Sequence, residues 1–243
     1  RSKYPIDEDL LARAKKLKFI GRVGAGLENI DVNAVESRNI HLLNAPEGNR
    51  NAVGEHALGM LLSLMNRLNL GDAAIRSGRW DREGHRGWEL SGRTVGIIGY
   101  GNTGKSFAQK LSGFTVKTLC YDILDNVGDK FARQVSLEKL QSQCEVISLH
   151  IPQTPLTRGM IDKKFIESMD HPFWLLNTAR GSAVITKDLV SGLQSQKIMG
   201  AGLDVLEYET QSFNSIFNGD ELPGTLKYLM HADHVLLLSL IHI

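Results

Sequence analysis

The sequence predicts an α/β protein built on a doubly wound parallel sheet, with part of a second α/β domain ahead of it. Two observations predict this fold class. Residues 94–122 have the pattern of strand, glycine turn, helix and strand, and from there onward short apolar runs alternate with stretches of helical spacing. We place the partial second domain at residues 1–47 and the sheet domain at residues 48–243, with the C-terminal end of the sheet domain incomplete.

The composition is that of an ordinary globular protein, since 42% of the 243 residues are hydrophobic and 23% are charged. A formal net charge of +1 gives no reason to expect nucleic acid as a partner. No apolar run approaches membrane-spanning length and no signal peptide opens the chain, so we expect a cytoplasmic protein without a membrane partner. Cys120 and Cys144 fall beside or within predicted strands and are expected to be buried, reduced thiols. The eight histidines show no ligand spacing with cysteines or acids, so no metal is predicted.

The first segment has few elements: a helix is predicted over 7–17, a strand over 18–23, a helix over 31–37 and a strand over 40–43. So few elements cannot close a sheet around a core of their own, and the chain starts at Arg1 without methionine. We therefore expect the beginning of this domain to be missing. Gly24-Ala25-Gly26 follows the first strand at once, and the exposed backbone N–H groups of such a loop are suited to holding a small anion.

A long amphipathic helix is predicted from Asn51 to Leu70, with Asn51 as its N-cap and Glu55 in its first turn. Its apolar residues recur at helical spacing: Ala57, Met60, Leu61, Leu64, Met65 and Leu68. This stripe could serve a two-fold interface between copies of the chain, or it could be buried within one chain. The polar segment 72–92 then ends the helix and leads to the sheet.

Residues 94–122 predict a dinucleotide site. A buried strand, Thr94–Ile98, runs into a G-x-G-x-x-G turn and then into a helix over 105–111; the three glycines are Gly99, Gly101 and Gly104. The first glycine permits the sharp reversal, the second lets the backbone approach a pyrophosphate, and the third lets the helix pack on the strand. The helix N-terminus favours phosphate. Asp122 ends the next strand about twenty residues later, where an acid binds the adenosine ribose and repels a 2′-phosphate. NAD is therefore favoured over NADP.

After Asp122 strands are predicted at 146–149, 174–176, 200–205 and 235–238, and helices at 136–141, 163–169 and 186–193. Ligands of doubly wound sheets bind beyond the carboxyl ends of the strands. One such end carries Arg180, whose planar guanidinium can bind a carboxylate through two hydrogen bonds or form a surface ion pair. Another carries Asp204, followed by Glu207 and Glu209, which could orient a histidine or form a solvated acidic loop.

Five sequence blocks, in this order, resemble those of the D-isomer-specific 2-hydroxyacid dehydrogenases: residues 22–31, 95–101, 148–152, 177–181 and 200–205. The resemblance covers nearly the whole chain as far as Leu237, and within the family it is greatest to members that act on D-3-phosphoglycerate. It implies a Rossmann sheet and NAD-dependent hydride transfer between a small 2-hydroxy acid and its 2-keto acid, as in serine biosynthesis. It also implies a homo-oligomer, a dimer or a tetramer.

The resemblance also implies roles for single residues. Arg180 would be the catalytic arginine that holds the substrate carboxylate and keto oxygen, and Glu209 would be the acid that pairs with the catalytic histidine. Asp204 would hold the nicotinamide amide. On the substrate side, Arg1 would contact the substrate phosphate, and the loop of Val23, Gly24, Ala25 and Gly26 would receive the carboxylate. On the cofactor side, Asn102 and Thr103 would face the pyrophosphate, while His150, Pro152 and Ala179 would line the groove, so His150 would not be the base.

The sequence departs from the family near its end. The proton donor of the family is a histidine in a Pro-His pair, which would fall at position 240, where this chain has Leu240. His242 lies two residues further on and is expected to be a terminal histidine without a role. We therefore expect a truncated or misread copy whose turnover is impaired.

Other functions are compatible with parts of this pattern. The missing base slightly favours a protein that binds NAD without catalysis and senses it for a partner protein. A methyltransferase that uses S-adenosylmethionine would leave Arg180 and Glu209 without a role. Among the dehydrogenases, enzymes acting on hydroxypyruvate, glyoxylate or lactate remain open, and a formate-type enzyme ranks last because it would not need Glu209.

Overall fold

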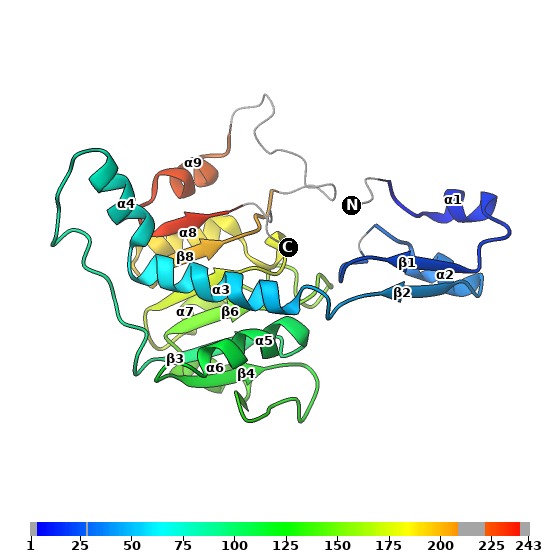
Figure 1. Ribbon diagram of the computed structural model, residues 1–243, viewed down its shortest axis with the longest axis horizontal. Helices are drawn as coiled ribbons and strands as arrows, with labels where there is room; N and C mark the ends of the chain where they lie inside the picture. Colours follow the sequence, from blue (N-terminus) through cyan, green and yellow to red (C-terminus); the bar gives the residue numbers. More distant parts are fainter. Residues whose placement is uncertain (1–3, 28, 209–221, 239–243) are drawn as a thin grey trace.

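A computed structural model of the 243-residue chain describes residues 4–27, 29–208 and 222–238. It contains two parallel sheets, one of two strands and one of seven (Figure 1). The fold class predicted from the sequence, a doubly wound α/β sheet with a smaller α/β part, is confirmed. Residues 45–49 connect the small sheet to helix α3 (Arg50–Met65), the first helix that packs on the large sheet.

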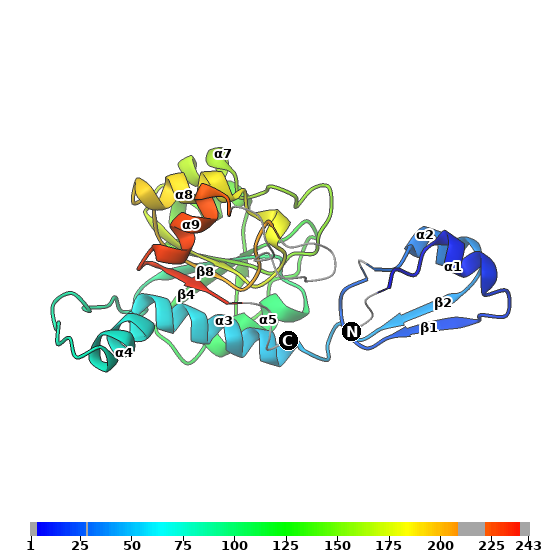
Figure 2. The same cartoon turned by 90° about the horizontal axis from the view of Figure 1, so that it is seen from above.

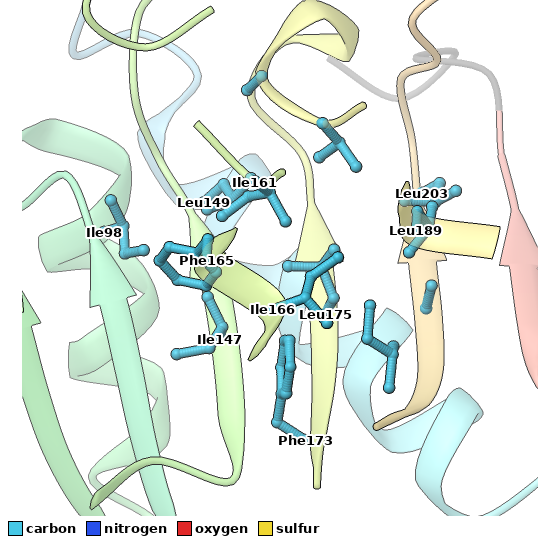
Figure 3. Packing of buried hydrophobic residues seen from close by; sticks show 14 of the residues in the cluster. Ile98, Ile147, Leu149, Ile161, Phe165, Ile166, Phe173, Leu175, Leu189 and Leu203 are labelled. Carbon is cyan, nitrogen blue, oxygen red and sulfur yellow. The ribbon is translucent and has the colours of Figure 1, made fainter. Parts of the chain in front are cut away.

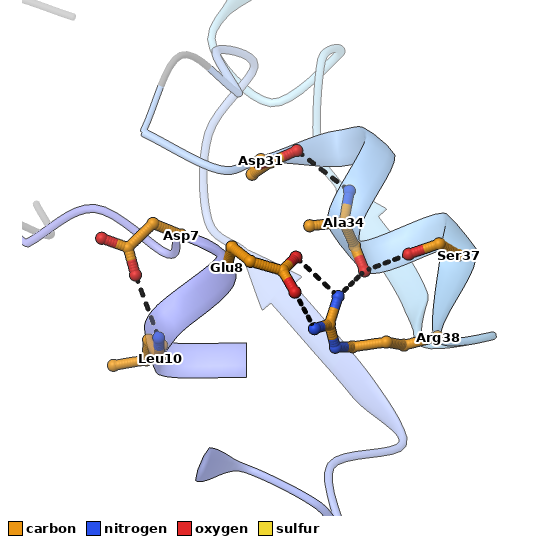
Figure 4. Close-up of polar contacts among 7 residues, drawn as sticks. All are labelled: Asp7, Glu8, Leu10, Asp31, Ala34, Ser37 and Arg38. Atoms are coloured by element: carbon orange, nitrogen blue, oxygen red, sulfur yellow. Dashed lines mark hydrogen bonds and ion pairs between the residues drawn. The ribbon is translucent and has the colours of Figure 1, made fainter. Parts of the chain in front are cut away.

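The N-terminal unit consists of α1 (Glu8–Arg13), β1 (Phe19–Arg22), α2 (Val32–Ser37) and β2 (His41–Asn44). Each helix has an aspartate as its N-cap, Asp7 for α1 and Asp31 for α2. The aspartate side chain accepts a hydrogen bond from the backbone N–H three residues further on, that of Leu10 or Ala34 (Figure 4). The Arg38 guanidinium joins the two helices through an ion pair with Glu8 and also donates to the carbonyl of Ala34. This unit has its own small core: Leu11, Ile20, Ile30, Ala34, Val35 and Ile40.

The large sheet has the strand order β5-β4-β3-β6-β7-β8-β9, and all neighbouring strands are parallel. Its strands are β3 (Thr94–Ile98), β4 (Lys117–Tyr121), β5 (Arg133–Gln134), β6 (Val146–Leu149), β7 (Phe173–Asn177), β8 (Ile198–Leu203) and β9 (Val235–Leu237). The order reverses between β3 and β6, because the chain first moves outward to β4 and β5 and then crosses to the other side. A ligand is expected beyond the carboxyl ends of the strands at this switch point.

Helices cover both faces of the large sheet (Figure 2). The helices of this part of the chain are α3 (Arg50–Met65), α4 (Leu68–Arg76), α5 (Asn102–Leu111), α6 (Leu137–Gln143), α7 (Lys163–Glu167), α8 (Thr186–Gln194) and α9 (Gly224–His231), together with a short 3₁₀ helix, η1 (Gly181–Ala183). Helices α3 and α5 pack on one face, and α6 to α9 pack on the other. Neighbouring residues of β3 show this division, since Ile97 belongs to the core beneath α3 and α5 and Ile98 to the core beneath α6 to α9. Figure 3 shows Ile98 within the latter core. Both faces of the sheet are therefore buried, as expected for a parallel sheet.

The long helix predicted from Asn51 to Leu70 is wrong in its extent. The structure has two helices, because Arg67 adopts the left-handed conformation (φ 53°) between α3 and α4. The N-cap of α3 is Asn49, not Asn51, and its side chain makes no capping hydrogen bond. Most of the predicted apolar stripe is buried within the chain, whereas Leu68 is exposed. Helix α4 lies at the end of the molecule opposite the N-terminal unit (Figures 1 and 2).

Candidate functional site

A cleft of about 510 Å³ lies at the carboxyl ends of β3, β6 and β7, between these strands and the loop that follows β1. Its walls come from both units of the molecule. The lining residues are Ala25, Gly26, Leu27, Pro46, Asn49, Val53, Asn102, Thr103, His150, Ile151, Pro152, Gln153, Thr178, Ala179 and Arg180. The cleft thus brings together eight of the residues that the sequence analysis assigned to a site: Ala25, Gly26, Asn102, Thr103, His150, Pro152, Ala179 and Arg180.

The glycine turn forms one end of this cleft. Gly99 has φ +89°, and a Cβ built on it would lie 2.4 Å from the carbonyl oxygen of His150, so only glycine fits there. A Cβ on Gly104 would lie 2.2 Å from the carbonyl oxygen of Gly99, which shows how closely α5 packs on the turn. A Cβ on Gly101, in contrast, would meet nothing within 4 Å. Gly101 therefore leaves open space beside the first turn of α5, whose N–H groups and positive dipole end suit a phosphate.

Asp122 lies on the other side of the glycine turn, outside the main cleft. Its Oδ2 accepts a hydrogen bond from the Tyr100 N–H at 2.7 Å, and its Oδ1 accepts one from the Leu124 N–H at 3.0 Å. It borders a second hollow of about 570 Å³ at the carboxyl ends of β4 and β5, lined by Tyr121, Asp122, Asp125, Asn126, Gln134, Val135 and Ser136. The acid is therefore attached to the glycine turn and faces an open, acidic hollow.

His150 lies in the wall of the main cleft directly after β6. Its Nε2 is 2.9 Å from the Ser148 hydroxyl, and its ring is tilted against that of Phe107 with the centroids 5.4 Å apart. Burial lowers the pKa of His150 to about 3, because the charged imidazolium would lose its hydration. The ring is therefore neutral at physiological pH.

Three buried polar atoms that belong to cleft-lining residues have no hydrogen-bond partner within the described part of the chain. They are Asn49 Oδ1, His150 Nδ1 and Thr178 Oγ1. Buried polar groups nearly always have partners, and each one without a partner costs about 1–3 kcal/mol. Three such atoms around one cleft, together with the open space at Gly101, fit a polar ligand with several hydrogen-bonding groups, as a dinucleotide has. The sequence analysis did not single out Asn49 or Thr178, although Thr178 lies within the block that contains Arg180.

Arg180 extends from the turn that follows β7. The Asn177 side chain folds this turn, because its Oδ1 accepts from the Ala179 N–H at 3.1 Å and its Nδ2 donates to the Arg180 carbonyl at 2.9 Å. The Arg180 guanidinium donates to the Ala179 carbonyl at 2.7 Å and is partly exposed to the cleft. Since His150 is neutral, Arg180 is the single formally charged residue among the described residues that line the cleft. The cleft is therefore suited to an anionic ligand.

The loop after β1 contributes only part of its predicted set to the cleft. Ala25 and Gly26 line it, whereas Val23 is 98% exposed and borders a separate hollow of about 210 Å³ in the N-terminal unit. Gly24 lies between them and does not line the cleft. Side chains from both strands hold the loop, because Asn44 Nδ2 donates to the Ala25 carbonyl at 3.0 Å and Arg22 Nε donates to the Gly26 carbonyl at 3.2 Å.

The predicted acids at the end of β8 separate into different environments. Asp204 is fully buried, with its Oδ1 3.3 Å from Nε2 of His56 on α3, and its backbone N–H donates to the Asn177 carbonyl. Glu207 has a structural role, because its Oε2 accepts from the Thr186 N–H at 2.8 Å at the start of α8. Glu209 and Arg1 lie outside the described residues, as do Leu240 and His242.

Other sequence expectations concern metals, membranes and thiols. Within residues 4–27, 29–208 and 222–238, no three His, Cys, Asp or Glu side chains gather into a group that could hold a metal ion. In the same part of the chain, none of the helices has the length and apolar character needed to cross a bilayer. Cys120 and Cys144 are both buried and free, as predicted, and burial raises their thiol pKa values to about 11 and about 12.

A parallel sheet with its switch point at a glycine turn, and an acid at the end of the next strand, defines the chain as an α/β dinucleotide-binding protein of the Rossmann class. Comparison with known families identifies it further. The sequence model of the D-isomer specific 2-hydroxyacid dehydrogenase NAD binding domain matches residues 58–238, and the chain belongs to this family. The matched domain is a NAD binding domain, which agrees with the cofactor predicted from the sequence.

Individual relatives agree with this assignment. The chain is 35% identical over 222 residues to D-3-phosphoglycerate dehydrogenase of Mycobacterium tuberculosis, which is 89% of this chain and 42% of that protein. It is 34% identical over 209 residues to hydroxypyruvate reductase of Thermotoga maritima, which is 86% of this chain and 68% of that protein. The chain therefore spans less than half the length of the phosphoglycerate dehydrogenase.

Solved structures of the family have the same fold. D-2-hydroxyisocaproate dehydrogenase superposes with a TM-score of 0.86 at 29% identity, covering 98% of this chain and 73% of that chain. D-lactate dehydrogenase of Aquifex aeolicus, solved with NAD and lactic acid, gives a TM-score of 0.83 at 29% identity, covering 96% and 72%.

Proposed function

We propose that this protein transfers a hydride between NAD(H) and a small D-2-hydroxy or 2-keto acid, with D-3-phosphoglycerate and 3-phosphohydroxypyruvate as the first substrate pair to test. One observation carries the proposal. A single cleft of about 510 Å³ joins the start of the glycine-turn helix, the Arg180 guanidinium and the loop after β1. The residues that we assign to the nucleotide, to the substrate carboxylate and to a backbone anion site thus contribute to one cleft, which supports the proposal.

On the cofactor side, the residues at the glycine turn would hold the dinucleotide. Gly99, Gly101 and Gly104 shape the turn, Asn102 and Thr103 begin the helix that faces the pyrophosphate, and Asp122 would accept hydrogen bonds from the adenosine ribose. His150, Pro152 and Ala179 would line the groove, and we assign Asp204 to the nicotinamide amide. Bound NAD supplies the hydride acceptor, and NADH the hydride donor.

On the substrate side, Arg180 would bind the carboxylate through two parallel hydrogen bonds and polarise the neighbouring keto oxygen. The loop from Val23 to Gly26 would hold the same carboxylate with backbone N–H groups. We keep Arg1 as a contact to a substrate phosphate and Glu209 as the acid that would orient a proton-donating histidine, whose expected position, 240, is Leu240 in this sequence.

The relatives support two substrate classes. The curated phosphoglycerate dehydrogenases are matched at identities from 32% to 35%. Hydroxypyruvate reductase of Thermotoga maritima is matched at 34%, but over 68% of its own length rather than 42%. This larger overlap favours hydroxypyruvate as the second candidate. We also propose a homo-oligomer, a dimer or a tetramer, on the basis of the family resemblance.

The experiment measures NADH consumption by the full protein with 3-phosphohydroxypyruvate, hydroxypyruvate, glyoxylate and pyruvate, in parallel with NADH affinity by fluorescence titration. Arg180→Gln should lower kcat/KM for the preferred acid by about 100-fold or more, because a donor aimed at the reacting oxygen is lost, while NADH affinity changes less than about twofold. Arg79→Gln, at an exposed arginine after α4, is the matched control and should leave both quantities unchanged.

The possible outcomes separate the alternatives. Full activity of Arg180→Gln with every acid would contradict the assigned role of Arg180. NADH binding without turnover of any acid would instead support the non-catalytic NAD-binding alternative. Absence of NADH binding would overturn the proposed function itself.

A further inference from the structure

We propose that Tyr100 is a positioning residue for the adenosine end of the cofactor, because it fastens the loop that carries Asp122 to the glycine turn. The inference rests on the proposed binding of NAD and adds to it the residue that holds the ribose-binding acid in place. Here the Asp122 loop means residues 122–134, which comprise the connection from β4 to β5 and β5 itself.

Tyr100 is bound to this loop at two separate points. It stands between the first two glycines of the turn and is only 1% exposed. Its backbone N–H donates to Asp122 Oδ2 at 2.7 Å, and its hydroxyl donates to Asp129 Oδ1 at 2.7 Å. The glycine turn alone does not require a tyrosine here, since the position between the first two glycines of the G-x-G-x-x-G pattern is not fixed. One buried side chain therefore connects the phosphate-binding turn to the far end of the Asp122 loop.

Further hydrogen bonds inside the Asp122 loop carry this connection back to Asp122. Asp129 Oδ1 also accepts from the N–H groups of Phe131 at 2.8 Å and Ala132 at 3.3 Å. The Gln134 side chain closes the loop, because its Nε2 donates to the Leu124 carbonyl at 2.7 Å and its Oε1 accepts from the Val127 N–H at 2.9 Å. Leu124 in turn donates to Asp122 Oδ1. Movement at Asp129 is thus coupled through Gln134 and Leu124 to the Asp122 carboxylate.

The Tyr100–Asp129 bond is charge-assisted at neutral pH. Burial acts to raise the pKa of Asp129, but the hydrogen bonds from the Tyr100 hydroxyl and the Phe131 and Ala132 N–H groups outweigh it and lower the pKa overall. Burial and the Asp129 charge raise the pKa of Tyr100, so the hydroxyl keeps its proton. A neutral hydroxyl donating to a carboxylate forms a hydrogen bond stronger than one between two neutral groups.

The hollow beside this loop is suited to a ribose. Each Asp122 oxygen accepts one backbone N–H and keeps capacity for another donor, so the carboxylate can also accept a sugar hydroxyl. Asp125 borders the same hollow of about 570 Å³, and two carboxylates there would repel a 2′-phosphate. When the Tyr100 hydroxyl is lost, the exposed loop gains conformations that must be given up again on binding, and affinity falls.

The test compares Tyr100→Phe with the unmodified protein by titration with NAD and with ADP-ribose, which shares only the adenosine and pyrophosphate part. We expect the Kd for both ligands to rise about tenfold and by the same factor, as for the loss of one charge-assisted hydrogen bond. We expect KM for NAD to rise in parallel, with kcat at saturating NAD within about twofold of the unmodified value. A purely structural loss would lower kcat as well.

Asp129 offers an independent variant, because it lies on the exposed loop and its replacement leaves the buried core intact. Asp129→Ala should raise both Kd values as Tyr100→Phe does, and the double variant should add no further loss. Asp129→Asn keeps an acceptor oxygen and should recover part of the affinity. Tyr228→Phe is the matched control: Tyr228 lies on α9, outside the Asp122 loop, with its hydroxyl 3.4 Å from His234 Nε2, and the Kd values of this variant should be unchanged.

The results distinguish failure of the role proposed for Tyr100 from failure of the proposed function. If the unmodified protein binds NAD and ADP-ribose but Tyr100→Phe and Asp129→Ala have Kd values within twofold of it, the positioning role is wrong and the proposed function stands. If the unmodified protein binds neither ligand, the proposed function fails and the positioning role fails with it.

Discussion

At the scale of the residue, His150 shows how burial sets the chemical state of a group in the cleft. Its imidazole lies between Ser148 and Phe107 and is held neutral by the loss of hydration. A neutral ring cannot serve as the acid that protonates a keto oxygen, but it can line a cofactor groove as an aromatic wall with one hydrogen-bonding nitrogen. The lowered pKa also makes His150 a source of pH-dependent stability.

We predict that the free energy of unfolding falls as the pH is lowered from about 6.5 toward 3, with His150 contributing up to about 1.4 kcal/mol per pH unit. The sign follows from a folded pKa of about 3 that lies below the unfolded value of 6.5. The unfolded chain binds the proton first, so the stabilisation is complete above pH 6.5 and is lost as the pH falls. Denaturant titrations of the unmodified protein and His150→Gln at several pH values between 7 and 4 would measure the difference in slope.

His171→Gln is the matched control for this measurement, because His171 is exposed. For His171→Gln, the free energy of unfolding should depend on pH as steeply as in the unmodified protein. For His150→Gln, the dependence should be weaker by the contribution of about one proton. Equal slopes for the unmodified protein and His150→Gln would show that His150 can be protonated in the folded state.

At the scale of the element, the contact between α5 and the glycine turn determines whether the phosphate site forms. Helix α5 approaches β3 closely only because Gly104 has no side chain: a Cβ there would lie 2.2 Å from a backbone oxygen, which cannot rotate away. Gly101, two residues after Gly99, faces open space instead. Two glycines of one motif thus have different roles: Gly104 permits close packing within the protein, and Gly101 leaves room for a ligand.

We predict that alanine at these two positions affects protein stability differently, although both variants bind NAD more weakly. Gly104→Ala should destabilise the protein by about 1–3 kcal/mol, because the turn and α5 must separate, and NAD affinity should fall with it. Gly101→Ala should leave the melting temperature nearly unchanged but weaken NAD binding, because its methyl group enters the space left for the pyrophosphate. Thermal melts and NAD titrations of both variants would test this.

Gly113→Ala, where the nearest atom is 3.9 Å away, is the control. If Gly101→Ala lost stability rather than affinity, the open space at Gly101 would not belong to a ligand site.

The sequence was sufficient for the elements whose signals are local. The strand, turn and helix at residues 94–111 have a fixed glycine spacing, and most other strands are continuous apolar runs. The break between α3 and α4 was not predictable, because the helical spacing continues through Leu68. It depends on a distant segment: the Trp88 N–H donates to the Met65 carbonyl at the end of α3, and Gly87 packs against Asn66. The strand β5 was missed because its two residues are too short to show a period. Helix α9 was missed as well, although its eight residues exceed the seven of α6 and the five of α7.

The site could be predicted only where a motif or the family pattern marked it. Arg180 and the loop after β1 are far apart in the sequence, and their common cleft follows from the fold rather than from any local signal. Asn49 was missed because Asn51 also fitted the N-cap position of α3. The N-cap position of α8 belongs to Ile185, and the Glu207 carboxylate binds the Thr186 N–H from another part of the chain. Such contacts between distant residues leave no local pattern in the sequence.

At the scale of the whole molecule, the two sheets differ greatly in the support they receive. The seven-stranded sheet lies between two helical layers, and its cores contain most of the buried hydrophobic residues. The two-stranded sheet has six core residues, and Phe19 and Leu43 on its strands are more than half exposed. Two-stranded sheets are marginally stable without further packing. We infer that residues 1–47 form a separate and weaker unit, although the main cleft depends on their loop for one of its walls.

This difference predicts a gradient of hydrogen exchange. Backbone amides of β1 and β2 should exchange through local opening at a much lower free energy than those of β3, β6 and β7, which should exchange only on global unfolding. Adding NAD should slow exchange around the glycine turn, whereas adding NADH together with a 2-keto acid should also slow exchange in residues 23–27, because the acid would bridge the two units through Arg180 and the loop after β1. Hydrogen exchange followed by mass spectrometry would measure the slower exchange at the glycine turn and at residues 23–27. Arg180→Gln is the control, because it should remove the effect of the acid on residues 23–27.

Equal protection of the two sheets would mean that the small unit is part of the same cooperative structure. Slowing at residues 23–27 by NADH alone would mean that the loop responds to the nucleotide and not to the acid.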